Sequence, residues 1–146
     1  MSRAFVKEGD GRPERPAPRP VSAGPNYVTP AGLDRLREAL AHARAAGDER
    51  NAAYYEERIA GAEVVASHSG PRGTIAFGSA AAVRESGGAL VRVRIVGEDE
   101  ADPKSGTIAW NSPYAQALMG HRAGDRVVVQ RPAGPAAVVV ESVDDA

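Results

Sequence analysis

The chain has 146 residues and a formal net charge of −1, a size that fits one ordinary domain or two small ones. Near-neutrality argues against a general binder of polyanions, because phosphate binding needs a surplus of cations. The sequence has no cysteine, which excludes disulfides, thiolate zinc sites and cysteine nucleophiles. It has no apolar run long enough to span a bilayer and begins without the apolar stretch of a secretory signal, so a cytoplasmic location is expected.

The first 26 residues differ in composition from the rest of the chain. They combine five prolines with charged and small residues and carry little apolar surface to offset the entropy of ordering. We therefore predict that residues 1–26 form a disordered, proline-rich tail. A second interpretation is a docking arm with Phe5 and Val6 as its apolar anchor.

Two helices are predicted over residues 27–66. Thr29 and Pro30 are a good N-cap and first helical residue, and Asp48, after Gly47, can cap a second helix. Apolar residues recur at spacings of 3, 4 and 3 in both segments, in mirror-image order about the turn, so each helix is expected to pack against the other as an antiparallel coiled coil of roughly 25 Å. The apolar stripes are Leu33, Leu36, Leu40 and Ala43, and Ala52, Tyr55, Ile59 and Ala62; the charged side chains assigned to the solvent-facing sides are Arg35, Arg37, Glu38, Arg44, Arg50, Glu56, Glu57 and Arg58.

Residues 67–73 are rich in turn formers and are interpreted as a linker. From residue 74 the apolar period changes to two, which is typical of strands, and one short helix is predicted from Ser112 to Gly120. The fold class is therefore α+β, with the helical hairpin followed by a small antiparallel sheet, over 74–146, and one covering helix. The predicted strands are Thr74–Phe77, Ala81–Glu85, Leu90–Val96, Gly106–Trp110, Arg126–Gln130 and Ala136–Ser142.

Few residues suggest chemistry of the chain's own. The three histidines, His42, His68 and His121, share no metal-ligand spacing, and neither a phosphate-binding P-loop nor a G-x-S-x-G turn is present, so we do not expect an enzyme. Two acidic clusters remain, Asp48-Glu49 at the predicted hairpin tip and residues 98–102. The first is explained by helix capping, and its alternative is to present carboxylates to a metal ion. The second is explained by a solvated loop, and its alternatives are a Mg²⁺ or Ca²⁺ loop, for which EF-hand spacing is absent, or a docking patch for a basic partner.

Three motifs in the second half of the chain resemble the C-terminal domain of GreA/GreB transcription elongation factors. They are I-V-G-E-D-E-A-D at 95–102, I-A-W-N-S-P at 108–113 and A-L-M-G at 117–120. S-R-A-F-V-K-E at 2–8 and N-Y-V-T-P-A-G at 26–32 look like the GreB-like branch. With the hairpin, the resemblance covers nearly the whole chain after the tail.

The resemblance implies an N-terminal coiled coil, an FKBP-like C-terminal domain and bacterial RNA polymerase as the partner. In such factors the C-terminal domain docks at the rim of the secondary channel, and acidic residues at the coiled-coil tip help hold the Mg²⁺ ion of the polymerase. By position, the tip candidates are Asp48 and Glu49. We expect no stably bound metal and no cofactor beyond that shared Mg²⁺. The chain is expected to be a monomer that binds no nucleic acid in a sequence-specific way. The docking candidates are Asp99, Glu100, Asp102, Asn111, Ser112 and Pro113.

The hairpin is shorter than a full Gre coiled coil by about two heptads per helix, which removes roughly 20 Å of reach. Shortened relatives of the Rnk type are associated with polymerase binding without cleavage stimulation. The favoured function is therefore a polymerase-binding regulator at the secondary channel, with stimulation of transcript cleavage as the alternative. A third hypothesis, an FKBP-like peptide-binding module, has only Phe77, Trp110 and Tyr114 to line its pocket.

Overall fold

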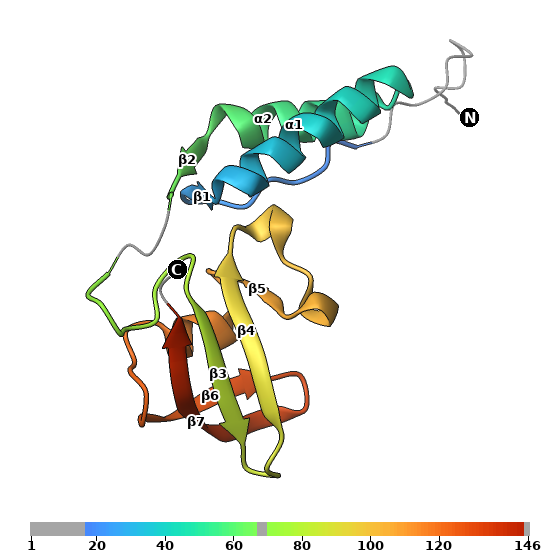
Figure 1. Ribbon diagram of the computed structural model, residues 1–146. Helices are drawn as coiled ribbons and strands as arrows, with labels where there is room; N and C mark the ends of the chain where they lie inside the picture. The colour runs from blue at the N-terminus through green and yellow to red at the C-terminus, as the bar shows by residue number, and fades with distance from the viewer. Residues whose placement is uncertain (1–16, 67–69, 145–146) are drawn as a thin grey trace, which may run out of the picture.

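The computed structural model describes residues 17–66 and 70–144, and it divides into a helical hairpin and a sheet domain (Figure 1). Helix α1 spans Pro30–Ala45 and helix α2 spans Glu49–Ala60. Both predicted caps are present, because Thr29 accepts a hydrogen bond from the Gly32 N–H and Asp48 accepts one from the Asn51 N–H. None of the described helices is long and apolar enough to cross a membrane.

The two helices pack through the predicted apolar stripes. Leu36, Ala43 and Ala52 are buried, as the mirror-image spacing requires. The second helix is shorter than predicted, however, because it ends at Ala60 and Gly61 follows as its C-cap. The assignment of Ala62 to the apolar stripe of the second helix is therefore wrong, since Ala62 lies in a strand.

That strand belongs to a two-stranded sheet at the base of the hairpin. Strand β1 (Asn26–Val28) precedes α1, and strand β2 (Ala62–Val64) follows α2. They pair in parallel, with Asn26 opposite Ala62 and Val28 opposite Val64. The prediction of disorder up to residue 26 is wrong for its last ten residues, because Asn26 starts β1 and the segment before it contacts α2; residues 1–16 lie outside the described part of the chain.

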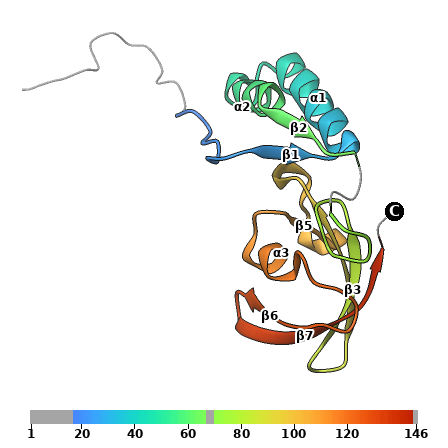
Figure 2. The same ribbon diagram turned by 90° about the vertical axis from the view of Figure 1, so that its left-hand side faces the viewer.

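The second domain is a curled five-stranded sheet of order β5-β4-β3-β7-β6 (Figure 2). Three of its four pairings are antiparallel, as predicted, but β4 and β5 run in parallel. The reason is the segment between them, residues 97–106, whose two short 3₁₀ helices, η3 and η4, lead the chain back before β5 begins. The strands are β3 (Ala80–Glu85), β4 (Leu90–Val96), β5 (Thr107–Ala109), β6 (Arg126–Arg131) and β7 (Gly134–Asp144), and the short helices are η3 (Glu98–Glu100) and η4 (Pro103–Ser105).

Helix α3 (Pro113–Leu118) packs against this sheet and buries Ala115 and Leu118. Its predicted cap is present, since Ser112 accepts a hydrogen bond from the Ala115 N–H. The predicted strand Thr74–Phe77 is wrong. Ile75 and Phe77 are buried in the core, but glycines with φ of 80° and 89° at positions 73 and 78 turn the chain on both sides, so the segment is too short to form a ladder.

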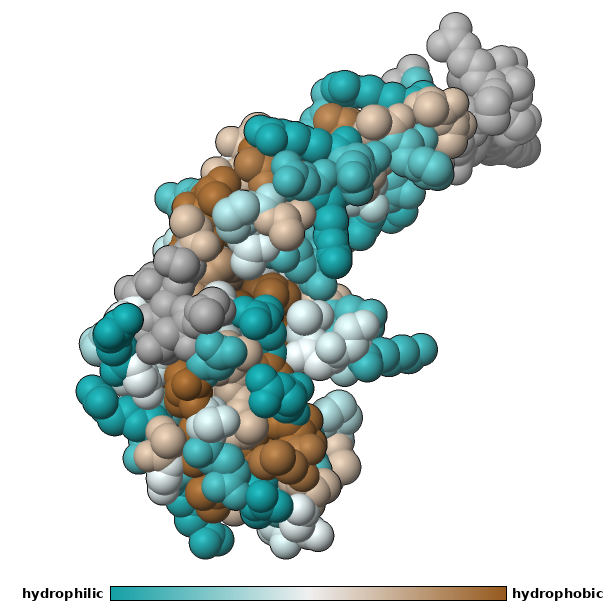
Figure 3. Space-filling view, viewed as in Figure 1, coloured by the Kyte–Doolittle hydropathy of each residue, from teal (hydrophilic) through white to brown (hydrophobic). Residues whose placement is uncertain are grey.

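The hairpin projects from one end of the sheet domain. Figure 3 shows hydrophilic surface mixed with small apolar patches along the hairpin, and further apolar patches over the sheet domain. The predicted linker includes residues 67–69, which lie outside the described residues. Of the two hairpin strands, β1 is the one that contacts the sheet domain, through η3, and β2 lies on its far side (Figure 2).

Candidate functional site

The far end of the hairpin carries the predicted acidic pair. Asp48 accepts hydrogen bonds from the Asn51 N–H at 3.1 Å and from the Asn51 side-chain amide at 2.7 Å. Glu49 follows in the first turn of α2 and is exposed. Asn51 thus holds the Asp48 carboxylate across the start of the helix and leaves Glu49 free to face outward.

The pKa of the Asp48 carboxyl lies below its ordinary value. The main cause is the hydrogen bond from the Asn51 backbone, followed by the bond from the Asn51 side chain; the charges of Arg50 and Arg19 add to it. The carboxylate is therefore ionised at neutral pH. Within residues 17–66 and 70–144, no three His, Asp or Glu side chains are grouped so that they could hold a metal ion. The tip thus presents the ionised Asp48 carboxylate next to the exposed Glu49.

A second cluster lies at the junction of the hairpin and the sheet domain. Arg58 of α2 is only 3% exposed, and its Nε donates to Asp99 of η3 at 2.7 Å. A terminal guanidinium nitrogen donates to the Asn26 side chain at 2.7 Å and lies 3.3 Å from a Glu98 carboxylate oxygen. Tyr54 adds a hydrogen bond from its hydroxyl to Asp99. This buried network joins α2, β1 and η3.

Glu100, at the end of η3, makes the second connection across the junction. Its carboxylate accepts from the Thr29 N–H and hydroxyl, just before α1, and from the Gly97 N–H at 3.1 Å. The carboxylate fits against Gly32, where an added Cβ would lie 2.2 Å from it. A negative charge at the N-terminus of a helix is favourable, because it complements the helix dipole and satisfies free N–H groups.

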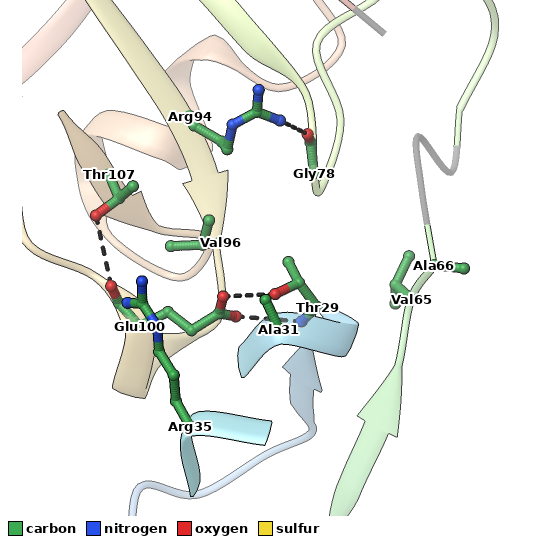
Figure 4. A pocket seen from close by; sticks show the side chains of 10 residues that line it. All are labelled: Thr29, Ala31, Arg35, Val65, Ala66, Gly78, Arg94, Val96, Glu100 and Thr107. Atoms are coloured by element: carbon green, nitrogen blue, oxygen red, sulfur yellow. Dashed lines mark hydrogen bonds between the residues drawn. The ribbon is translucent and has the colours of Figure 1, made fainter. Parts of the chain in front are cut away.

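A cavity of about 320 Å³ opens beside Glu100, between the first turn of α1, the chain after β2 and the edge of β4 (Figure 4). Arg35 and Arg94 contribute to its wall from opposite domains. Arg94 donates to the Gly78 carbonyl at 2.9 Å, which fixes one end of its guanidinium group. The junction therefore combines specific polar bonds around an open space with apolar packing of Tyr27 and Val65 against the core of the sheet domain.

The six predicted docking residues do not share one environment. Asp99 and Glu100 point inward and are used in the junction, where the Asp99 side chain is 12% exposed. Asp102 is exposed, although its carboxylate also accepts from the Lys104 N–H and the Ser105 hydroxyl. The remaining three are the exposed Asn111, the helix cap Ser112 and the exposed Pro113.

The aromatic residues named for a peptide pocket pack against neighbours. Phe77 is 6% exposed, and its ring centroid lies 6.2 Å from that of Tyr27. Trp110 meets the same tyrosine edge to face at 4.9 Å. Tyr114 packs against the core, and its partial burial raises the pKa of its hydroxyl. Phe77 and Trp110 thus pack against Tyr27 of β1, whereas Tyr114 packs against the core near Glu85 and Arg131, so the three rings do not line one pocket.

Sequence reasoning missed the junction. Arg58 was placed on the solvent-facing side of the hairpin, and this prediction is wrong because the side chain is buried against η3. Asn26, Thr29 and Gly32 were noted only as part of a motif or as a cap. The available signal was that two of the motifs that carry the resemblance, at 26–32 and 95–102, contain Gly32 and Glu100, for which no local role was found; in the structure these motifs face each other.

The structure defines a class of proteins in which a helical hairpin is joined to a curled sheet domain by this junction. Comparison with known proteins identifies the family of this chain. A family model described as "Transcription elongation factor, GreA/GreB, C-term" matches residues 70–145. GreA of Methylococcus capsulatus is 34% identical over 137 aligned positions that cover 81% of this chain and 87% of that protein. GreA of an Anaeromyxobacter strain is 38% identical, with 75% and 76% covered.

Among solved structures, a GreA/GreB factor from Nitrosomonas europaea is similar at 21% identity and a TM-score of 0.45, covering 82% of this chain and 98% of that one. The chain belongs to the GreA/GreB family of transcription elongation factors. Factors of this family act with RNA polymerase in transcription.

Proposed function

We propose that this chain binds bacterial RNA polymerase at the secondary channel and regulates transcription without stimulating cleavage of the transcript. The observation that carries the proposal is the length of the hairpin. Helices of 16 and 12 residues extend about 24 Å and 18 Å. With about two heptads fewer per helix than a full Gre coiled coil, the tip stops roughly 20 Å short of the polymerase metal.

The sheet domain is the proposed docking unit. Asp102, Asn111 and Pro113 are exposed and belong to the motifs by which the family was identified. Asp99 and Glu100, in contrast, are used to position the hairpin. We therefore restrict the proposed docking surface to Asp102, Asn111 and Pro113. The proposed mode of action is occupation of the channel entrance, in competition with longer Gre factors.

The test is a binding competition. A fluorescently labelled sample of the chain is titrated with RNA polymerase, and full-length GreA is then added as the competitor. Saturable binding that GreA displaces completely supports a shared docking site. Binding that GreA leaves unchanged contradicts the proposed site, and absence of binding contradicts the proposal as a whole.

Stimulation of cleavage is the second candidate, and the tip geometry favours it. Asp48 is ionised and Glu49 is exposed beside it, so the tip presents two carboxylates. In this role Asp48 and Glu49 would help to hold a metal ion of the polymerase, and that ion would supply activation of water for in-line attack on RNA. In this mechanism, too, the catalytic centre belongs to the polymerase, and the chain is not an enzyme by itself.

A further inference from the structure

The residues before β1 do not extend freely into solvent. Residues 17–22, which we call the strap, run along α2 from the hairpin tip towards its base, in the same direction as the helix (Figure 1). Arg19 and Val21 are half-buried, and the rest of the strap is exposed. A proline-rich sequence suits this position, because an extended proline segment loses little entropy when it binds a surface.

Arg19 is the centre of the contact. Its guanidinium group lies 3.7 Å above the centroid of the Tyr54 ring, and one nitrogen donates to the Asn51 side-chain oxygen at 3.0 Å. Asn51 in turn donates to Asp48, and Tyr54 donates to Asp99. Arg19 therefore touches two residues of α2, one of which holds the tip while the other holds the junction.

The two ends of the strap are fixed at opposite ends of α2. Near the tip, Arg50 Nε donates to the Ala17 carbonyl at 2.7 Å, and Pro18 lines a shallow groove above Ala52 and Ala53. At the other end, the Ser22 hydroxyl lies 2.6 Å from the carboxylate oxygens of Glu98, which belongs to the sheet domain. The strap thus spans from the hairpin tip to η3.

We propose that the strap is a clamp that fixes the direction of the hairpin relative to the sheet domain. The Arg58 and Glu100 bonds lie at the base of the hairpin, where a small displacement becomes a large one at the tip. The strap adds contacts farther along α2 and connects them to Glu98, so it resists bending at the junction. This inference does not depend on binding to polymerase, and it is tested on the protein alone.

The absence of cysteine makes the test direct. Ala46→Cys at the tip and Ala133→Cys in the β6–β7 turn are both exposed positions, and the pair accepts two spin labels in the full-length chain. Pulsed electron spin resonance then gives the distribution of distances between hairpin and sheet domain. For the otherwise unchanged chain we expect one narrow distribution.

Arg19→Ala combined with Ser22→Ala removes the stacking contact and both side-chain bonds of the strap without touching either domain's core. We expect the ratio of clamped to released molecules to fall at least about tenfold, which broadens the distribution. Arg37→Ala, which removes an exposed charge on α1, is the matched control and leaves the distribution narrow. If circular dichroism shows an intact fold, an unchanged distance distribution in the double variant overturns the proposal. A distance in the unchanged chain that depends on protein concentration overturns it as well, because the strap would then bind a second copy of the chain.

Discussion

At the scale of single residues, Arg58 shows how a charged side chain becomes structural. It is nearly inaccessible to water, and its guanidinium group contacts the carboxylates of Asp99 and Glu98 and the side chain of Asn26. A buried charge is tolerated only when its partners satisfy it, and removal of one member leaves the others unpaired. The network therefore holds the junction in one arrangement and makes it sensitive to substitution.

We predict that Arg58→Ala lowers the free energy of unfolding by about 3 kcal/mol, because it leaves the Asp99 carboxylate buried without its cation. Denaturation by urea measures the change. Arg37→Ala, which breaks an exposed pair 3.8 Å long, should change stability by less than about 0.5 kcal/mol. If the two variants are equally stable, Arg58 does not have the role given to it here.

Tyr54 provides a pH-dependent readout of the same junction. Burial, with a further contribution from Asp99, raises the pKa of Tyr54 to about 12 from 10.0. The folded protein thus keeps a proton that the unfolded chain loses above pH 10.0, so this contribution to stability is complete below pH 10.0 and is lost as the pH rises towards 12. Tyr54→Phe should flatten the fall in stability over this range, whereas Tyr55→Phe should leave it unchanged; equal slopes in both variants would speak against the assignment.

At the scale of elements, the contact between α1 and η3 depends on a glycine that lies within a helix. Gly32 has no side chain where Glu100 approaches, so its replacement by alanine must displace the carboxylate from Thr29. Alanine is at the same time the better helix former by about 1 kcal/mol. These two effects have opposite signs and can be separated in a double-mutant cycle.

We predict that Gly32→Ala destabilises the protein by roughly 1 kcal/mol, because the lost bonds to a charged acceptor outweigh the gain in helix propensity. In a Glu100→Ala background the same substitution should instead stabilise the protein by up to about 1 kcal/mol. Thermal and urea unfolding of the four proteins measure the coupling. Additive effects would mean that Glu100 is not held against Gly32.

The elements that could be predicted from the sequence are those with local signals. The caps Thr29, Asp48 and Ser112 and the apolar stripes identified the three α-helices found within residues 17–66 and 70–144, since capping and amphipathic spacing are properties of neighbouring residues. The three-residue strands β1 and β2 could not be predicted, because each exists only through its partner some 36 residues away. The parallel pairing of β4 with β5 was not expected either, because it depends on how residues 97–106 lead the chain back between the two strands.

At the scale of the whole molecule, the acidic motif at residues 98–102 holds carboxylates in two different environments, and its role in docking stays a prediction. Its sequence cannot tell which carboxylates face a partner and which face the hairpin, because that depends on how the two domains meet. The structure divides it: Glu98, Asp99 and Glu100 face the hairpin, whereas Asp102 faces solvent. The prediction for binding therefore rests on Asp102.

We expect Asp102→Arg to weaken binding to RNA polymerase by about tenfold while the fold stays intact, because reversal of an exposed charge at an interface acts on encounter and orientation. Asp34→Arg, an equivalent reversal on exposed α1, is the control and should bind as the unchanged chain does. Fluorescence titration with polymerase measures both, and equal affinities for the two variants would remove Asp102 from the docking surface.

The central claim is that the hairpin is too short to act on the polymerase metal. The most direct measurement is cleavage of radiolabelled RNA in stalled, backtracked polymerase complexes, with a full-length GreA as the positive control. Asp48→Asn with Glu49→Gln serves as the tip variant, since asparagine retains the helix cap. We predict no stimulation by the chain or by its tip variant, and reduced stimulation when the chain is added together with GreA. Strong stimulation by the chain, lost in the tip variant, would contradict the claim and establish it as a cleavage factor.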